Sequence, residues 1–440
     1  MTYENIKSII LAILIVLSVL LTWGLWTYQP NYDIMENAKT VQEVALSEKK
    51  DLKEIVRPDR IFYHSRESHL GTNDPLEINK TIKELSRWNF NDFQDISSGV
   101  DNLEEFLQDQ NKVEIVYPDI IPIDLYKNVL NIKVKDELNI GFDRIVISLE
   151  NTTRESGFVY FISYSENTVV QSRVTASFIT NYETNFYTNA ANNPKFIRYV
   201  AEETSEGRSL FVTEDPVTMS LYNYLIDPLP TEKFRDALFN DPSFVQNNYI
   251  APIEEYTDGS TLLTINHDQN NIFYVNPAQE NEVSMGANNI LQKSIDFVNG
   301  HGGWTDPYRY VGMDPLGQSI VFRLYDPNGY PIFSDTGISE VLQVWGENEI
   351  NKYLRNNFSL GRRVESMEIT LLSGKDALEN LKKLDDFNPE FLQDLVLGYK
   401  MSKETQGPLV QLEPSWFYKY NDQWWILPTD QNGGLKHGLE

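Results

Sequence analysis

The hydrophobic pattern begins with an uninterrupted apolar run near the N-terminus. Residues 9–28 read IILAILIVLSVLLTWGLWTY and contain no charge. Twenty helical residues, each rising ~1.5 Å, span about 30 Å, which is the thickness of a bilayer's hydrocarbon core. The run ends in Trp23, Trp26 and Tyr28, residue types that favour the membrane–water interface. We therefore expect an uncleaved transmembrane anchor, because a signal peptide has a shorter core of roughly 7–15 residues and a small-residue cleavage site.

The charges that flank this run indicate its orientation only weakly. Lys7 precedes it, and the thirty residues beyond it contain both acidic and basic side chains. A short segment comes before the run and the bulk of the chain comes after it. We expect a single-pass protein of the cell membrane, with its N-terminus in the cytoplasm and its bulk outside.

One face of the predicted anchor carries small and hydroxyl side chains. At ~100° per residue, Ser8, Ala12, Ser18 and Thr22 fall within an arc of about 120°. Small residues let a second helix approach closely, and hydroxyls can bond across the gap. The alternative is that such residues merely occur in single-pass anchors. The candidate partner-helix interface comprises Ser8, Ala12, Ile15, Val19, Thr22 and Trp26.

Beyond the anchor, the pattern predicts an α+β fold of antiparallel sheets with packed helices. Apolar or alternating runs rich in β-branched and aromatic residues indicate strands, among them 60–64, 113–117, 143–149, 158–163, 169–178, 196–200, 210–213, 219–225, 261–266, 272–275, 308–311, 320–325, 330–333, 416–420 and 424–427. Helical spacing indicates helices at 76–88, 101–107, 231–239, 288–299, 350–358, 376–384 and 389–397. Tight turns at 268–271 and 326–329 predict two hairpins.

Polar stretches divide the predicted elements into domains. Residues 31–55 are polar and charged and are predicted to form a stalk, and a Thr/Asn-rich stretch at 180–193 marks a boundary or a long connection. The expected division is a cytoplasmic tip with the anchor at 1–30, the stalk at 31–55, three α+β domains at 56–190, 191–285 and 286–430, and a tail at 431–440.

Composition narrows the classes of partner. The chain of 440 residues has 37 basic and 64 acidic side chains, a formal net charge of −27. A surface this acidic repels phosphate backbones, so we expect no nucleic-acid partner. Cysteine is absent, which excludes disulfides, thiolate metal sites and a Cys nucleophile.

Candidate chemistry is sparse, so we expect no enzyme, no cofactor and no metal. The zinc motif H-E-x-x-H and the nucleophile motif G-x-S-x-G do not occur. His64 and His69 are a weak zinc pair, and adjacent acids such as Glu254 and Glu255 point to opposite faces of a strand. Aromatic residues between Trp416 and Trp425 could stack on sugars, although their alternation favours core packing.

Five segments together resemble the YycH family. They are Tyr3–Ser8, Thr22–Tyr32, Arg57–Ile61, Tyr325–Asp335 and Trp416–Trp425. The resemblance extends over the whole chain in architecture as well as in motifs, and the first thirty residues are its most specific part.

The resemblance implies an accessory protein of Gram-positive bacteria with its domains outside the membrane. Members act with a YycI-like membrane protein on the sensor histidine kinase YycG (WalK), which belongs to a two-component system controlling cell-wall metabolism. The family implies kinase contact through transmembrane helices and has no known catalytic residues. The assignment of the contact to particular residues comes from the helical wheel alone. The alternative function is a membrane-anchored binder of cell-wall polymer without a kinase role.

Overall fold

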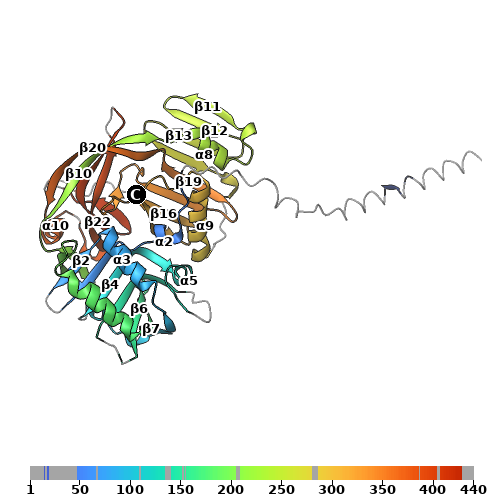
Figure 1. Cartoon of the computed structure of the whole chain (residues 1–440). Helices are drawn as coiled ribbons and strands as arrows, with labels where there is room; N and C mark the ends of the chain where they lie inside the picture. The colour runs from blue at the N-terminus through green and yellow to red at the C-terminus, as the bar shows by residue number, and fades with distance from the viewer. Residues whose placement is uncertain are drawn as a thin grey trace, which may run out of the picture. The chain divides into compact units, whose positions relative to one another are not determined.

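The computed structural model describes Leu14, Leu17, Ser18 and residues 47–428, except 66–67, 109–110, 134–139, 151–152, 154, 205–208, 280–285, 386 and 404–406. The chain divides into two compact units, Met1–Glu43 and Val44–Glu440. Nearly all described residues belong to the second unit, which contains three β-sheets and several helices (Figure 1). The α+β class expected from the sequence is confirmed.

Most of the predicted anchor lies outside the described residues. Ser8, Ala12, Ile15, Val19, Thr22 and Trp26 all lie outside the described residues. Within the part of the chain that is described, no helix combines the length and the apolar character needed to cross a membrane.

The N-terminal sheet has nine strands in the order β3-β7-β6-β5-β4-β1-β2-β8-β9, and its recorded strand pairs are antiparallel. The bounds are β1 Arg60–His64, β2 His69–Thr72, β3 Asn91–Asp95, β4 Lys112–Pro122, β5 Gly141–Ser148, β6 Ser156–Ser163, β7 Thr168–Thr175, β8 Ile197–Glu203 and β9 Ser209–Thr213. Side chains alternate between its faces: Ile145 and Ile147 join the main core, whereas Val146 joins a smaller cluster against helix α4 (Leu103–Gln108).

Helices cover one face of this sheet. Helix α3 (Pro75–Leu85) begins where the side chain of Asp74 accepts hydrogen bonds from the backbone N–H groups of Leu76 and Glu77. Beside it runs a second helical stretch, formed by α6 (Ala176–Tyr182), a π-helical segment (Glu183–Tyr187) and α7 (Thr188–Ala190) (Figure 1). The two are joined through Thr81 Oγ1, which lies 3.3 Å from the hydroxyl of Tyr182.

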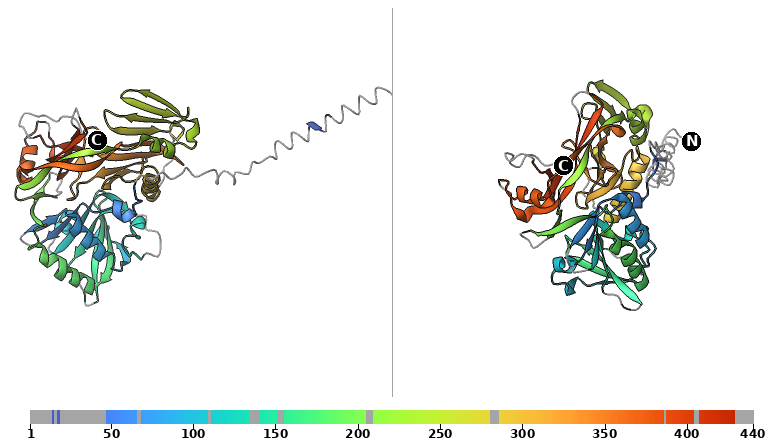
Figure 2. Two further views of the ribbon diagram at one scale, coloured as in Figure 1. Left: turned by 45° about the horizontal axis from the view of Figure 1, so that its top comes forward. Right: turned by 60° about the vertical axis from the view of Figure 1, so that its left-hand side comes forward.

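Two further sheets form the C-terminal half (Figure 2). An eight-stranded sheet has the order β11-β12-β13-β14-β19-β18-β16-β15, and a second sheet has the order β17-β21-β22-β10-β20 with β23 paired to β22. The bounds are β10 Val217–Pro228, β11 Gln246–Ile250, β12 Ile253–Thr257, β13 Leu262–Asn266, β14 Asn271–Val275, β15 Tyr308–Asp314, β16 Ser319–Leu324, β17 Ile332–Phe333, β18 Glu340–Trp345, β19 Ile350–Asn356, β20 Phe358–Leu371, β21 Leu392–Lys403, β22 Leu409–Tyr420 and β23 Gln423–Ile426.

Apart from α9 (Ala287–Gly300), the remaining helices are short. Helix α9 packs on the eight-stranded sheet, and Trp345 of that sheet donates its indole N–H to the hydroxyl of Ser294 in the helix (2.7 Å). The bounds of these helices are α2 Leu52–Ile55, α5 Ile123–Tyr126, α8 Thr231–Leu238, α9 Ala287–Gly300 and α10 Gly374–Leu381, with 3-10 turns at Ser97–Gly99, Pro242–Phe244, Pro277–Gln279 and Pro389–Phe391. Both C-terminal sheets take strands from either side of residue 285. The expected division into separate domains stays a prediction.

Four local predictions are wrong. Residues 350–358 and 389–397 were expected to be helical, but the first contains strand β19 and the second is a 3-10 turn followed by β21. The stretch 180–193 was expected to mark a boundary or a long connection, but it is largely helical. The stalk was expected to reach residue 55, yet Ile55 is fully buried in the core. In each case packing against distant strands overrides the local pattern.

The two predicted hairpins have different outcomes. β13 and β14 pair across the expected turn, from Leu262 opposite Val275 to Asn266 opposite Asn271. The turn at 326–329 also forms, since the N–H of Gly329 donates to the carbonyl of Asp326 (3.0 Å). Its flanking strands do not form a ladder, however: they share one bridge, and β17 instead pairs in parallel with β21.

Candidate functional site

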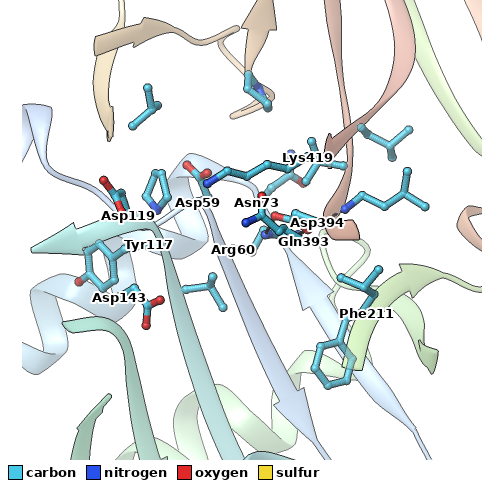
Figure 3. A pocket seen from close by; sticks show the side chains of 18 of the residues that line it. Asp59, Arg60, Asn73, Tyr117, Asp119, Asp143, Phe211, Gln393, Asp394 and Lys419 are labelled. Carbon is cyan, nitrogen blue, oxygen red and sulfur yellow. Dashed lines mark hydrogen bonds and ion pairs between the residues drawn. The ribbon is translucent and has the colours of Figure 1, made fainter. Parts of the chain in front are cut away.

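The candidate site is a cavity where the three sheets meet. Its volume is about 310 Å³, and its walls come from β1, β4 and β5 of the N-terminal sheet and from β15–β17, β21 and β22 of the C-terminal half (Figure 3). A volume of this size is at the lower end of the range of roughly 300–1,000 Å³ that small-molecule sites occupy.

An ion pair crosses this junction from β1 to β21. The guanidinium of Arg60 donates to both carboxylate oxygens of Asp394, at 3.1 and 2.6 Å. Asp394 lies at an irregularity in the pairing of β21 with β22, which lets its side chain leave the sheet. Burial lowers the pKa of Arg60, but the charge and hydrogen bonds of Asp394, together with the charge of Asp59, outweigh burial and raise that pKa. The pair therefore ties the two halves of the cavity together.

Residues 117–120 form a bulge of β4 that enters the cavity. Val116 pairs with Arg144 and Ile121 pairs with Phe142, so the segment between them has no regular partner on β5. Asp119 in this bulge accepts a hydrogen bond from the backbone N–H of Met313 at 2.8 Å on β15. Burial raises the pKa of its carboxyl group.

A second carboxylate stands on the neighbouring strand β5. Asp143 Oδ1 accepts a hydrogen bond from the backbone N–H of Tyr164 at 3.0 Å, and its side chain is 18% exposed. Burial raises the pKa of Asp143 to about 6, even though Arg144 opposes the shift, and the charge of Asp119 adds to it. Figure 3 shows Asp119 and Asp143 on the same side of the cavity, with Tyr117 beside them.

The arginines that line the cavity already have carboxylate partners. Arg144 bonds to Glu114, which has no exposed surface, and its guanidinium lies 4.3 Å above the ring of Tyr164. Arg323 donates from Nε to Glu340 at 2.8 Å. Lys419 on β22 is the remaining cation of the lining, and no ion pair joins it to another described residue. Its charge acts on Asp119, whose pKa it lowers against the effect of burial.

The histidines noted in the sequence do come together, although not as a zinc pair. His64 Nδ1 lies 2.9 Å from His69 Nδ1, and His64 Nε2 lies 3.0 Å from Glu114. Burial, followed by the neighbouring His64, lowers the pKa of His69 to about 4. Burial raises the pKa of Glu114, but Arg144 and His64 together outweigh burial and lower that pKa to about 2. Across the described residues, no three His, Asp or Glu side chains converge as a metal site would require.

The C-terminal aromatic residues are mainly core. Trp416 is 5% exposed, and Phe417 and Tyr418 are at most 1% exposed, which favours the packing interpretation. Trp416 and Trp424 line the cavity, so any stacking on a ligand by these two residues would occur there.

Asp119 and Asp143 have no local signal in the sequence, since neither belongs to a motif. Three of the segments that carry the family resemblance do converge on the cavity: 57–61 provides Asp59 and Arg60, 325–335 provides Tyr325 with several neighbours, and 416–425 provides Lys419.

Comparison with known proteins decides the family. Residues 4–191 match the model of the YycH protein N-terminal domain, and residues 207–433 match that of the C-terminal domain. The chain belongs to the YycH family. A YycH relative from Bacillus subtilis, named two-component system WalR/WalK regulatory protein YycH, is 26% identical over 458 residues, covering 100% of this chain and 99% of the relative.

A solved crystal structure of a YycH protein has the same fold as this chain. The crystal structure of YycH from Bacillus subtilis superposes with a TM-score of 0.74 at 22% identity, covering 87% of this chain and 99% of that one. The family is one of regulatory accessory proteins rather than of known enzymes.

Proposed function

We propose that this chain is a membrane-anchored regulator of a YycG/WalK-type sensor histidine kinase, in a two-component system that controls cell-wall metabolism. The observation that carries the proposal is the match along the full length of both chains to the regulatory protein of the WalR/WalK system. Both family models match as well, and together they extend from residue 4 to residue 433.

The apolar run at 9–28 supports the membrane anchor. It has the length and interfacial aromatic residues of a single-pass helix, and the folded body follows it in the chain. In this arrangement the short N-terminus lies in the cytoplasm and the body lies outside. A YycI-like membrane protein is the second partner that the family resemblance implies.

The proposed mechanism acts through helix contacts inside the membrane. A kinase whose transmembrane bundle has two packings separated by a few kcal/mol responds to a neighbour that binds one packing better. The face with Ser8, Ala12 and Val19 offers a close approach to such a neighbour, because its side chains are small or compact. The body outside the membrane positions the anchor and docks the YycI-like partner.

The test reconstitutes the full chain with the kinase and the YycI-like protein in one bilayer and measures autophosphorylation of the kinase. Ala12→Trp places a bulky ring on the proposed face, and Leu17→Trp places the same ring on the opposite face of the helix as a matched control. We expect Ala12→Trp to abolish most of the change in kinase rate and Leu17→Trp to preserve it.

A fragment experiment separates the membrane contact from a role of the body. Residues 1–35 alone should retain part of the effect on the kinase. If that fragment has no effect and the body has all of it, the helix-contact mechanism is wrong.

A further inference from the structure

The cavity between the three sheets has a charge distribution that points to a particular class of ligand. Its lining contains five carboxylates and four cations. Three of those cations are arginines, and each is already bonded to a carboxylate: Asp394 within the lining, and Glu114 and Glu340 outside it. The arginine charges are therefore neutralised, and acidic groups remain in excess.

Asp119 and Asp143 are two of the four lining carboxylates other than Asp394, and they lie on the same side of the cavity. Both accept hydrogen bonds from backbone N–H groups, which orient the carboxylates without neutralising them. The nearest cation to Asp143 is Arg144, whose Nε lies 3.9 Å away while the same guanidinium bonds to Glu114. Two partly buried carboxylates that act on one another are stabilised by a positive charge placed between them.

The walls beside these carboxylates suit an organic cation better than a metal ion. Tyr117 lies beside Asp119 and Asp143, and Phe211 lines the opposite side of the cavity (Figure 3). Aromatic faces attract ammonium groups and cover alkyl or sugar carbons, whereas a hard metal ion requires a compact set of oxygen ligands. The volume of about 310 Å³ accommodates a molecule rather than a single ion.

We propose that this cavity binds a small organic molecule carrying a primary ammonium group, with the ammonium held by Asp119 and Asp143 on the side of the cavity that both share. Lys419 extends from β22 into the same space, and its charge acts on Asp119 (Figure 3). It therefore competes electrostatically with the ligand. The inference concerns the chain alone and does not depend on the proposed kinase role.

The experiment is calorimetric titration of the purified full-length chain in detergent, at pH 8 and 150 mM salt, with four probes. Two probes carry ammonium groups, 1,5-diaminopentane and glucosamine. Two are matched in shape but lack the cation, glutarate and N-acetylglucosamine. The salt screens non-specific attraction of diamines to a chain of net charge −27.

Three substitutions in the cavity, and one outside it, assign the binding to these residues. Asp119→Asn and Asp143→Asn should each weaken binding of the ammonium probes by about tenfold, the effect of losing one charged hydrogen bond. Lys419→Met should tighten it by a few-fold, because a competing charge is removed. Structural damage cannot produce this gain in affinity. Asp215→Asn, at an exposed site outside the lining, should leave the affinity unchanged.

Binding of at least one ammonium probe, with this pattern of losses and gain and without binding of either matched control, supports the proposal. Failure of both ammonium probes to bind at millimolar concentration overturns it. Preferential binding of glutarate, or ammonium binding that none of the cavity substitutions changes, overturns it as well.

Discussion

The Arg60–Asp394 ion pair should stabilise the junction between the N-terminal sheet and the C-terminal half. The two hydrogen bonds measure 3.1 and 2.6 Å, and the side chains are 20% and 26% exposed. At a separation of about 3 Å and an effective dielectric constant of about 20, the attraction is roughly 5–6 kcal/mol. Desolvation of both charges offsets much of it. We expect a net coupling of about 1–3 kcal/mol.

A double-mutant cycle measures this coupling directly. The variants are Arg60→Met, Asp394→Asn and the combination of the two, and the free energy of unfolding comes from urea titration followed by tryptophan fluorescence. Each single substitution leaves the charge of the remaining partner uncompensated. The losses in free energy of unfolding for the two single substitutions should therefore sum to more than the loss for the double substitution.

An exposed ion pair provides the matched control. Lys80 and Glu77 on α3 form an i,i+3 pair at 2.8 Å, with the lysine side chain 61% exposed. Its cycle should give only a few tenths of a kcal/mol. If the coupling of Arg60 with Asp394 is no larger than that of this surface pair, the junction is not held in the way described.

Three further changes test other parts of the structure. Asp143→Asn should stabilise the chain by on the order of 2 kcal/mol at pH 8 and change its stability little at pH 4. The reason is that the pKa of Asp143 in the folded chain is raised to about 6, so the favoured, protonated form of its carboxyl group is lost as the pH rises through 6. Thermal unfolding at each pH measures the difference. Trp88→Ala should cost about 3–5 kcal/mol in urea unfolding, since the indole is fully buried and stacked on Phe178. Gly329→Ala should lower the melting temperature by several degrees, because φ is +91° and a Cβ would lie 2.2 Å from the carbonyl oxygen of Asn73.

For each of these three predictions, one result would contradict the reasoning. A stabilisation by Asp143→Asn that is equally large at pH 4 would rule out ionisation as its cause. A loss below 1 kcal/mol for Trp88→Ala would be inconsistent with a packed core at that position. An unchanged melting temperature for Gly329→Ala would show that the turn tolerates a side chain.

Local chemistry explains which elements the sequence predicts correctly. Helix α3 is predictable because its cap at Asp74 and its apolar spacing both act within a few residues. Strand β19 is not, because Ile350, Tyr353 and Leu354 have helical spacing, yet β14 and β18 pair with the segment from both sides. Neighbours distant in the sequence decide such segments.

The cavity is predictable only in part, for a similar reason. Asp119 and Asp143 lie on adjacent strands, and Lys419 enters from a strand that follows almost 300 residues later. No local spacing connects the three residues. Only the pairing of β4 with β5 and the packing of the sheets bring them together.

The measurement that tests the proposed function most directly is the autophosphorylation rate of the WalK-type kinase in a bilayer, with and without this chain and its YycI-like partner. We expect the rate to change when the full chain is present and to return most of the way to its starting value with Ala12→Trp but not with Leu17→Trp. A kinase whose rate is the same with and without the chain would contradict the account.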